Sequence, residues 1–304
     1  MFVTMFSITV ELQSGMENVL TVAERIKEGF ATLTRAERQL ANVMLENYPA
    51  SSLGTVVSLS EAAKVSTPTV VRLAKKLGFG GFPEMQRSIH EEIGDTLKSP
   101  IEKHDSIPSM DEKSHLLDRF ADAVVNNIRQ TVTQIDEKTF NDVVDVLSDQ
   151  NRSLYIVGGR ISHSIAEYMF THMQVIRANV TMVEPNANSW SHYVINMKPG
   201  DTLVVFDIRR YENDILTLAE IARSREVNLI LFTDQWGSPV VKLAQHVFHA
   251  RIEAPSAWDS TVAITFLVEA LVEAIQSATW SETSNRMKDL EVLLDKAKLF
   301  KKFV

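Results

Sequence analysis

The chain has 304 residues, contains no cysteine and carries a formal net charge of −8. The absence of cysteine excludes a disulfide framework and thiolate chemistry. No run reaches the roughly 18 apolar residues of a membrane-spanning helix, and the N-terminus lacks the pattern of a secretory signal. The composition therefore predicts a cytoplasmic protein with no membrane partner, and the length allows two domains.

The first part of the chain, residues 1–97, is expected to be an all-helical domain. Val22 and Ile26 belong to an apolar stripe with helical spacing. Thr34 and Glu37 have the spacing of a capping box, which predicts the start of a second helix. The same pattern of apolar stripes and caps continues to about residue 94.

Residues 58–78 are typical of a helix-turn-helix. A short helix at Leu59–Lys64 is followed by a turn and by a second helix, which Ser66 or Thr67 caps and Gly78 ends. This second helix begins with hydroxyl residues and carries cations along one side. A recognition helix that enters the DNA major groove has this arrangement.

The same segment supplies the candidate contacts to double-stranded DNA. Hydroxyl side chains at the start of the helix are expected to meet base edges and the cations to meet phosphates, while Arg72 suits either a guanine edge or a phosphate. The candidate DNA-binding residues are Lys64, Ser66, Thr67, Thr69, Arg72, Lys75 and Lys76. The alternative is a solvated helix face on which Ser66 and Thr67 only cap. The acidic total does not exclude DNA, because charges are screened within about 10 Å and this segment is locally basic.

Residues 98–113 have linker composition, with Pro and Ser among mixed charges, and a second domain is expected over residues 114–304. Two amphipathic helices come first in that domain. Short apolar strands then alternate with helices, and the expected strands are 153–157, 180–183, 202–206, 227–232 and 246–250. Continuous apolar strands between helices predict an α/β domain with a parallel sheet sandwiched between helices.

The N-terminal part resembles the RpiR-type helix-turn-helix. The likeness lies in Ala62, Val65-Ser66, Thr69-Val70-Val71-Arg72 and Leu77-Gly78-Phe79-Gly80-Gly81-Phe82. The C-terminal part resembles a sugar isomerase (SIS) domain. The resemblance implies a transcriptional regulator, most often a repressor in this family, that senses a small anionic effector such as a sugar phosphate or sugar acid. A palindromic operator would require a homodimer or homotetramer.

The resemblance places the effector at loops that follow the sheet strands, in agreement with the rule for open α/β sheets. The first loop, Gly158–Ser164, keeps the first Gly and the Ser of the family's Gly-x-Gly-x-Ser pattern but has Arg160 at the second Gly. It still opens a helix, whose N-terminus favours an anion. The second loop, residues 207–214, lacks the family's hydroxyl cluster and carries Arg209 and Arg210, whose guanidinium groups suit carboxylates and phosphates.

The candidate effector-binding residues are Gly158, Gly159, Arg160, Ser162, Ser164, Asp207, Arg209 and Arg210. The alternative is that the two arginines of the second loop form an ion-pair network with Asp207 and Glu212 at a subunit interface. No cofactor is predicted. No metal site is predicted either, since His246 and His249 are three residues apart in an expected strand and so face opposite sides.

An enzyme, a sugar-phosphate isomerase, is the second function class to weigh, because the same fold serves both. Isomerisation needs a placed general base. Glu212 and His192 are the available candidates, and neither stands in a recognisable catalytic context. The sequence therefore favours a regulator without enzymatic activity.

Overall fold

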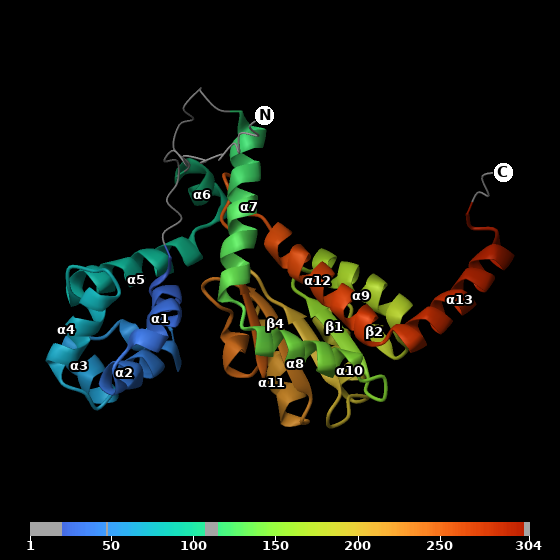
Figure 1. Ribbon diagram of the computed structural model, residues 1–304, viewed down its shortest axis with the longest axis horizontal. Helices are drawn as coiled ribbons and strands as arrows, with labels where there is room; N and C mark the ends of the chain where they lie inside the picture. Colours follow the sequence, from blue (N-terminus) through green and yellow to red (C-terminus); the bar gives the residue numbers. More distant parts are fainter. Residues whose placement is uncertain (1–19, 47, 107–114, 301–304) are drawn as a thin grey trace, which may run out of the picture.

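The computed structural model describes residues 20–46, 48–106 and 115–300. Figure 1 shows a helical N-terminal body beside a C-terminal body built on a sheet, with the long helix α7 (Leu116–Gln134) at the boundary. The buried apolar side chains form one core in the N-terminal body and two in the C-terminal body, one on each face of its sheet. The apolar cores of the two bodies are therefore separate.

The N-terminal body consists of six helices in the described residues: α1 (Val22–Gly29), α2 (Arg35–Glu46), α3 (Val56–Ala62), α4 (Thr67–Lys76), α5 (Phe82–Leu97) and α6 (Pro100–Ser106). Short 3-10 turns lie at Phe30–Thr32 and Ala50–Ser52. The predicted capping box is confirmed, because the backbone N–H of Thr34 donates to Glu37 and that of Glu37 to the Thr34 hydroxyl. Thr21 and Glu24 form a second capping box at the start of α1.

The helix-turn-helix is formed by α3 and α4. Between them Lys64 adopts a left-handed φ of 50°, and the N–H of Val65 reaches back to the carbonyl of Ser60, which ends α3. Ser66 stands at the predicted N-cap position of α4, but its hydroxyl makes no capping hydrogen bond with the backbone; Pro68 lies in the first turn. Gly78 ends the helix with a φ of 90° that suits glycine.

The prediction of a linker over residues 98–113 needs correction in its first half. Pro100–Ser106 form α6, and Ser99 and Glu102 exchange backbone-to-side-chain hydrogen bonds at its start. Ser-Pro-x-Glu is a helix-start signal, which the high content of Pro and Ser concealed. Residues 107–113 lie outside the described residues.

The C-terminal body carries a parallel sheet of five strands in the order β2-β1-β3-β4-β5. The strands are β1 (Leu154–Gly158), β2 (Val180–Met182), β3 (Thr202–Phe206), β4 (Asn228–Asp234) and β5 (His246–Ala250), so the predicted α/β fold is confirmed. The chain reverses its direction of winding between β1 and β3, where Gly158 pairs with Phe206. In open α/β sheets ligands bind at this switch point.

Helices cover both faces of the sheet. Side chains of α8 (Glu137–Ser148), α9 (His163–Ile176) and α12 (Val262–Ala278) pack on one face, and those of α10 (Trp190–Val194) and α11 (Asn213–Ser224) on the other. The last helix, α13 (Trp280–Ala297), extends away from the sheet and was not predicted. Within the described part of the chain no single helix is long and apolar enough to cross a membrane; α12 and α13 pass that test only as a pair, bent by 100°.

Candidate functional site

The exposed face of α4 carries two cations. Arg72 and Lys75 are both exposed, and their spacing of three residues places them on the same side of the helix. Opposite this face, Val70, Leu73 and Ala74 are buried in the N-terminal core. Core packing thus holds the helix while its basic side faces solvent.

A chain of hydroxyl groups orients Arg72. The Ser66 and Thr69 hydroxyls lie 2.9 Å apart, and the Arg72 guanidinium donates to the Thr69 hydroxyl at 3.0 Å. Thr69 is only 3% exposed. The buried Thr69 hydroxyl therefore positions Arg72, and its predicted contact with a base stays a prediction.

The other predicted DNA-binding residues divide into two groups. Lys64 and Ser66 are exposed at the turn before α4, and Thr67 is half-buried in its first turn. Lys76 bends back instead, because its ammonium group donates to the carbonyl of Thr32 at 2.7 Å and pairs with Glu37 at 3.1 Å. Lys76 thus links α4 to α2 and holds the recognition helix, and its phosphate contact stays a prediction.

A pocket lies where the switch point meets the N-terminal body, and we call it the junction pocket. Six of the eight predicted effector-binding residues line it, namely Gly159, Arg160, Ser162, Asp207, Arg209 and Arg210. Lys98, Pro100 and Lys103, from the end of α5 and from α6, also line it, as does Asp259 before α12. The pocket thus draws cations from both bodies of the molecule.

The loop after β1 is held by its own backbone contacts. A Cβ on Gly158 would lie 2.7 Å from backbone atoms of Ser162 and His163, so only glycine fits this approach. The Ser162 hydroxyl donates to the carbonyl of Phe206 at 2.8 Å, and the Ser164 hydroxyl donates to the carbonyl of Ile161 at 2.9 Å. Gly158, Ser162 and Ser164 therefore shape the loop. Of the three, Ser162 lines the junction pocket, and their contacts with an effector stay a prediction.

Carboxylates of the protein itself already accept hydrogen bonds from groups in and around this pocket. The backbone N–H of Arg160, expected to bind an anion, donates to Glu212 at 2.7 Å. Asp207 is 2% exposed and accepts a hydrogen bond from Ser238, and burial raises the pKa of its carboxyl to about 6. Asp207 therefore joins the loops after β3 and β4. It also lines the junction pocket, and its contact with an effector stays a prediction.

Arg209 is held from several sides. Its N–H donates to Asp234 at 2.8 Å, and its guanidinium lies 4.1 Å from the centre of the Trp236 ring. The guanidinium pairs with Asp259 at 2.8 Å and donates to the carbonyl of Asp95, in α5, at 2.5 Å. Arg209 thus joins the two bodies of one chain through Asp259 and Asp95, and this pairing differs from the predicted network with Asp207 and Glu212.

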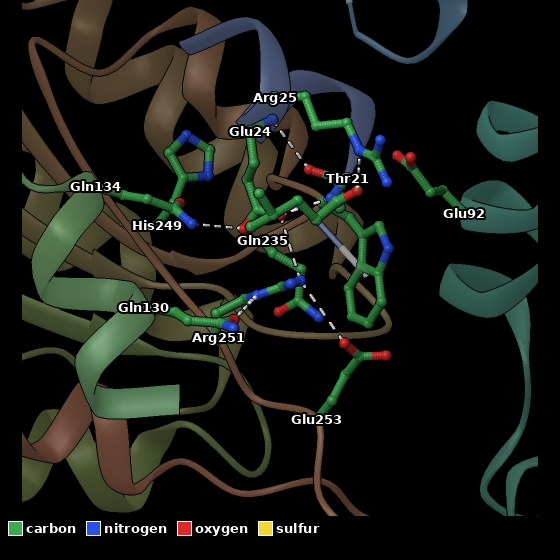
Figure 2. Close-up of polar contacts among 12 residues, drawn as sticks. Thr21, Glu24, Arg25, Glu92, Gln130, Gln134, Gln235, His249, Arg251 and Glu253 are labelled. Atoms are coloured by element: carbon green, nitrogen blue, oxygen red, sulfur yellow. Dashed lines mark hydrogen bonds and ion pairs between the residues drawn. The ribbon is translucent and has the colours of Figure 1, made fainter. Parts of the chain in front are cut away.

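A second contact between the bodies is the polar seam, formed by Glu24 of α1 with Gln130, Gln134 and Arg251 (Figure 2). Arg251 pairs with Glu24 at 3.3 Å, and the two side chains are 1% and 3% exposed. Gln134 donates to Glu24 at 2.9 Å, and Arg251 donates to Gln130 at 2.9 Å. Because both charges are buried, this seam fixes the orientation of the helical body on the sheet.

Sequence reasoning missed Lys103, Asp259 and the polar seam. Lys103 lay in the expected linker, and Asp259 follows β5 with no motif around it. Their meeting depends on tertiary structure alone. For the enzyme alternative, His192 lies on α10 and does not line the junction pocket, and Glu212 is engaged by Arg160. The described residues contain no cluster of His, Asp and Glu suited to a metal ion.

Comparison with known proteins gave consistent results along the chain. Residues 20–96 match the family model for the rpiR-family helix-turn-helix domain, and residues 146–274 match the SIS domain. The regulator HexR of Pseudomonas aeruginosa is 25% identical over 235 residues, which cover 75% of this chain and 76% of HexR. An uncharacterised HTH-type transcriptional regulator of Thermotoga maritima is 23% identical over 75% of this chain and 80% of its own length.

Solved structures show the same fold. The Vibrio vulnificus NanR protein, complexed with ManNAc-6P, superposes with a TM-score of 0.53 at 18% identity, covering 92% of this chain and 99% of NanR. The sugar isomerase domain of an RpiR transcription factor from Sphaerobacter thermophilus gives a TM-score of 0.55 at 18% identity, covering 59% of this chain and 99% of that domain. The NanR match includes both bodies of the molecule.

Proposed function

Because this chain belongs to the RpiR family of helix-turn-helix transcriptional regulators, we propose that α4 enters the major groove of operator DNA and that the junction pocket binds a small anionic effector. The observation that carries the DNA site is the pair Arg72 and Lys75, exposed together on a helix whose opposite face is buried. Lys64 and Ser66 extend this surface to the turn, where phosphate contacts set the register of the helix.

The effector is a sugar phosphate or a sugar acid. The cations that line the junction pocket, Arg160, Arg209 and Arg210 with Lys98 and Lys103, support an anion. The NanR structure contains ManNAc-6P, which supports a sugar-derived ligand. Effector binding changes operator occupancy about 5- to 150-fold, for a coupling of about 1–3 kcal/mol.

A palindromic operator requires two copies of α4 about 34 Å apart. The protein therefore acts as a homodimer or homotetramer, in the cytoplasm, where its DNA lies. In this proposal it is a repressor that the effector releases.

Fluorescence anisotropy with labelled DNA from upstream of its own gene tests the DNA site. Arg72→Ala is expected to weaken binding by about 1–3 kcal/mol if Arg72 reads a base, and Lys75→Ala to reduce the salt slope by about 1. Lys288→Ala, which removes an exposed cation from α13, is the matched control. The proposal fails if no fragment is bound in a salt-sensitive manner, or if Arg72→Ala binds like the control.

A thermal-shift screen of phosphosugars, sugar acids and small carboxylates tests the effector site, since a ligand of the native state raises its apparent stability. Arg210 is exposed and its loss leaves the core intact. Arg210→Ala should reduce the shift given by the best ligand. An unchanged shift would favour a ligand site elsewhere.

A further inference from the structure

One carboxylate that lines the junction pocket contacts two cations. Asp259 offers one oxygen to the Arg209 guanidinium at 2.8 Å, and its other oxygen contacts the Lys103 ammonium. The Asp259 side chain is 5% exposed, and those of Lys103 and Arg209 are 16% exposed. Both oxygens of a nearly buried carboxylate thus bridge a cation of the sheet body and a cation of α6.

The backbone around this carboxylate is in an uncommon conformation. Asp259 has a φ of 62°, and Arg209 and Arg210 each have a φ of 46°. Left-handed backbone at residues other than glycine carries strain and persists where the surroundings impose it, most often at functional sites. Arg209 is also locked by Asp234 and Trp236. The exchangeable partners in the cluster are therefore Asp259 and Lys103.

The junction pocket has walls from both bodies of the molecule. Lys98, Pro100 and Lys103 form the part that comes from the end of α5 and from α6. A ligand that binds in this pocket therefore contacts the segment that Asp259 holds through Lys103.

We propose that Asp259 is an internal stand-in for the effector's anionic group, and that a carboxylate or phosphate of the effector replaces it on Arg209 and so breaks the bridge to Lys103. This inference rests on the proposed function of the junction pocket. An incoming carboxylate or phosphate can offer two oxygens to the guanidinium fork, whereas Asp259 offers it one. Once Asp259 is displaced, its bridge to Lys103 no longer holds α6, and with it the end of α5, against the sheet.

The release reaches the DNA-binding surface through α5. Met85 and Ile89 of α5 are fully buried in the same core as Leu73 of α4. Movement of the end of α5 therefore turns the body that carries the recognition helix. The polar seam at α1 provides the remaining attachment about which this turn occurs.

Inorganic phosphate is the first probe, because it presents the anion without a sugar. Asp259→Asn removes the charge of the stand-in, and asparagine tolerates the left-handed backbone at this position. By isothermal titration calorimetry, we expect Asp259→Asn to bind phosphate about tenfold more tightly than the unmodified protein, which corresponds to about 1.4 kcal/mol. Asp105→Asn, which removes an exposed carboxylate on the same α6, is the matched control and should bind as the unmodified protein does.

Hydrogen–deuterium exchange of residues 100–106 gives an independent readout. Phosphate should raise the exchange of α6 in the unmodified protein, and Lys103→Met should raise it without phosphate. Calorimetry and hydrogen–deuterium exchange are then repeated with gluconate, a sugar acid, in place of phosphate. This comparison shows whether the site responds to a carboxylate or to a phosphate.

The inference is overturned if Asp259→Asn binds phosphate no better than Asp105→Asn, or if α6 exchange does not respond to phosphate or to Lys103→Met. Operator binding is measured separately on the same proteins. Loss of salt-sensitive DNA binding refutes the proposed function, whereas intact DNA binding with an unchanged phosphate affinity refutes only the role of Asp259.

Discussion

The ion pair between Glu24 and Arg251 offers the sharpest test of how the two bodies are joined. Breaking a buried pair by removing one partner costs about 3–5 kcal/mol. Glu24→Gln removes the charge that faces Arg251 at 3.3 Å but keeps an amide oxygen that can accept one hydrogen bond. We therefore expect the lower end of that range, about 3 kcal/mol.

Two spectroscopic signals separate the bodies. All four tryptophans, Trp190, Trp236, Trp258 and Trp280, lie in the C-terminal body, so their fluorescence reports the sheet domain, whereas circular dichroism at 222 nm reports helices of both. In urea the two transitions should coincide in the unmodified protein. In Glu24→Gln, the N-terminal helices should unfold about 1–3 M urea earlier, because about 3 kcal/mol is lost and the m-value is about 1–3 kcal/mol/M.

The matched control is Glu28→Gln, which removes an exposed charge from the same helix. A double-mutant cycle with Arg251→Met isolates the pair, and its coupling energy should fall within about 0.5–3 kcal/mol. Superimposable urea curves for Glu24→Gln and Glu28→Gln would refute the reasoning, as would coincident transitions in Glu24→Gln.

Two further predictions concern Glu92 and Gly158. Burial raises the pKa of Glu92 to about 7, so the stability linked to its proton is fully present below about pH 4.5 and is lost as the pH rises through 7. Glu92→Gln mimics the protonated form of this side chain. In urea at pH 8, the variant should be more stable than the unmodified protein by up to about 3 kcal/mol, because each unit of pKa shift corresponds to about 1.4 kcal/mol. At pH 4.5 the two proteins should be equally stable. The reasoning would be contradicted if the stability of Glu92→Gln and that of the unmodified protein depended on pH in the same way. Gly158→Ala places a Cβ 2.7 Å from backbone, and should cost about 1–3 kcal/mol and abolish the thermal shift given by phosphate, whereas Gly94→Ala, whose Cβ meets nothing within 4 Å, should do neither.

Local signals predicted the DNA-binding helix well. Caps, the stop at Gly78 and the spacing of apolar residues act within a few positions of the chain, and α4 forms where they indicate. The side-chain roles were harder to predict. Thr69 looks like a surface hydroxyl in sequence, but the packing of α4 buries it beneath Arg72.

The switch point of the sheet could also be predicted, because alternating strands and helices determine which loops meet. Six of the eight predicted effector residues do line one pocket. The sequence could not predict which carboxylates contact the cations of this pocket. Lys103 and its partner Asp259, for example, are 156 positions apart and belong to different bodies. Glu212 was considered as a base or a network member, and its bond to Arg160 became visible only in three dimensions.

The separation of the cores has an evolutionary consequence. Because each body keeps its own apolar interior and the seam between them is polar, exchange of the first hundred residues between related genes leaves both interiors whole. A hybrid must keep Glu24 opposite Arg251 and Lys103 opposite Asp259, because these pairs connect the two bodies.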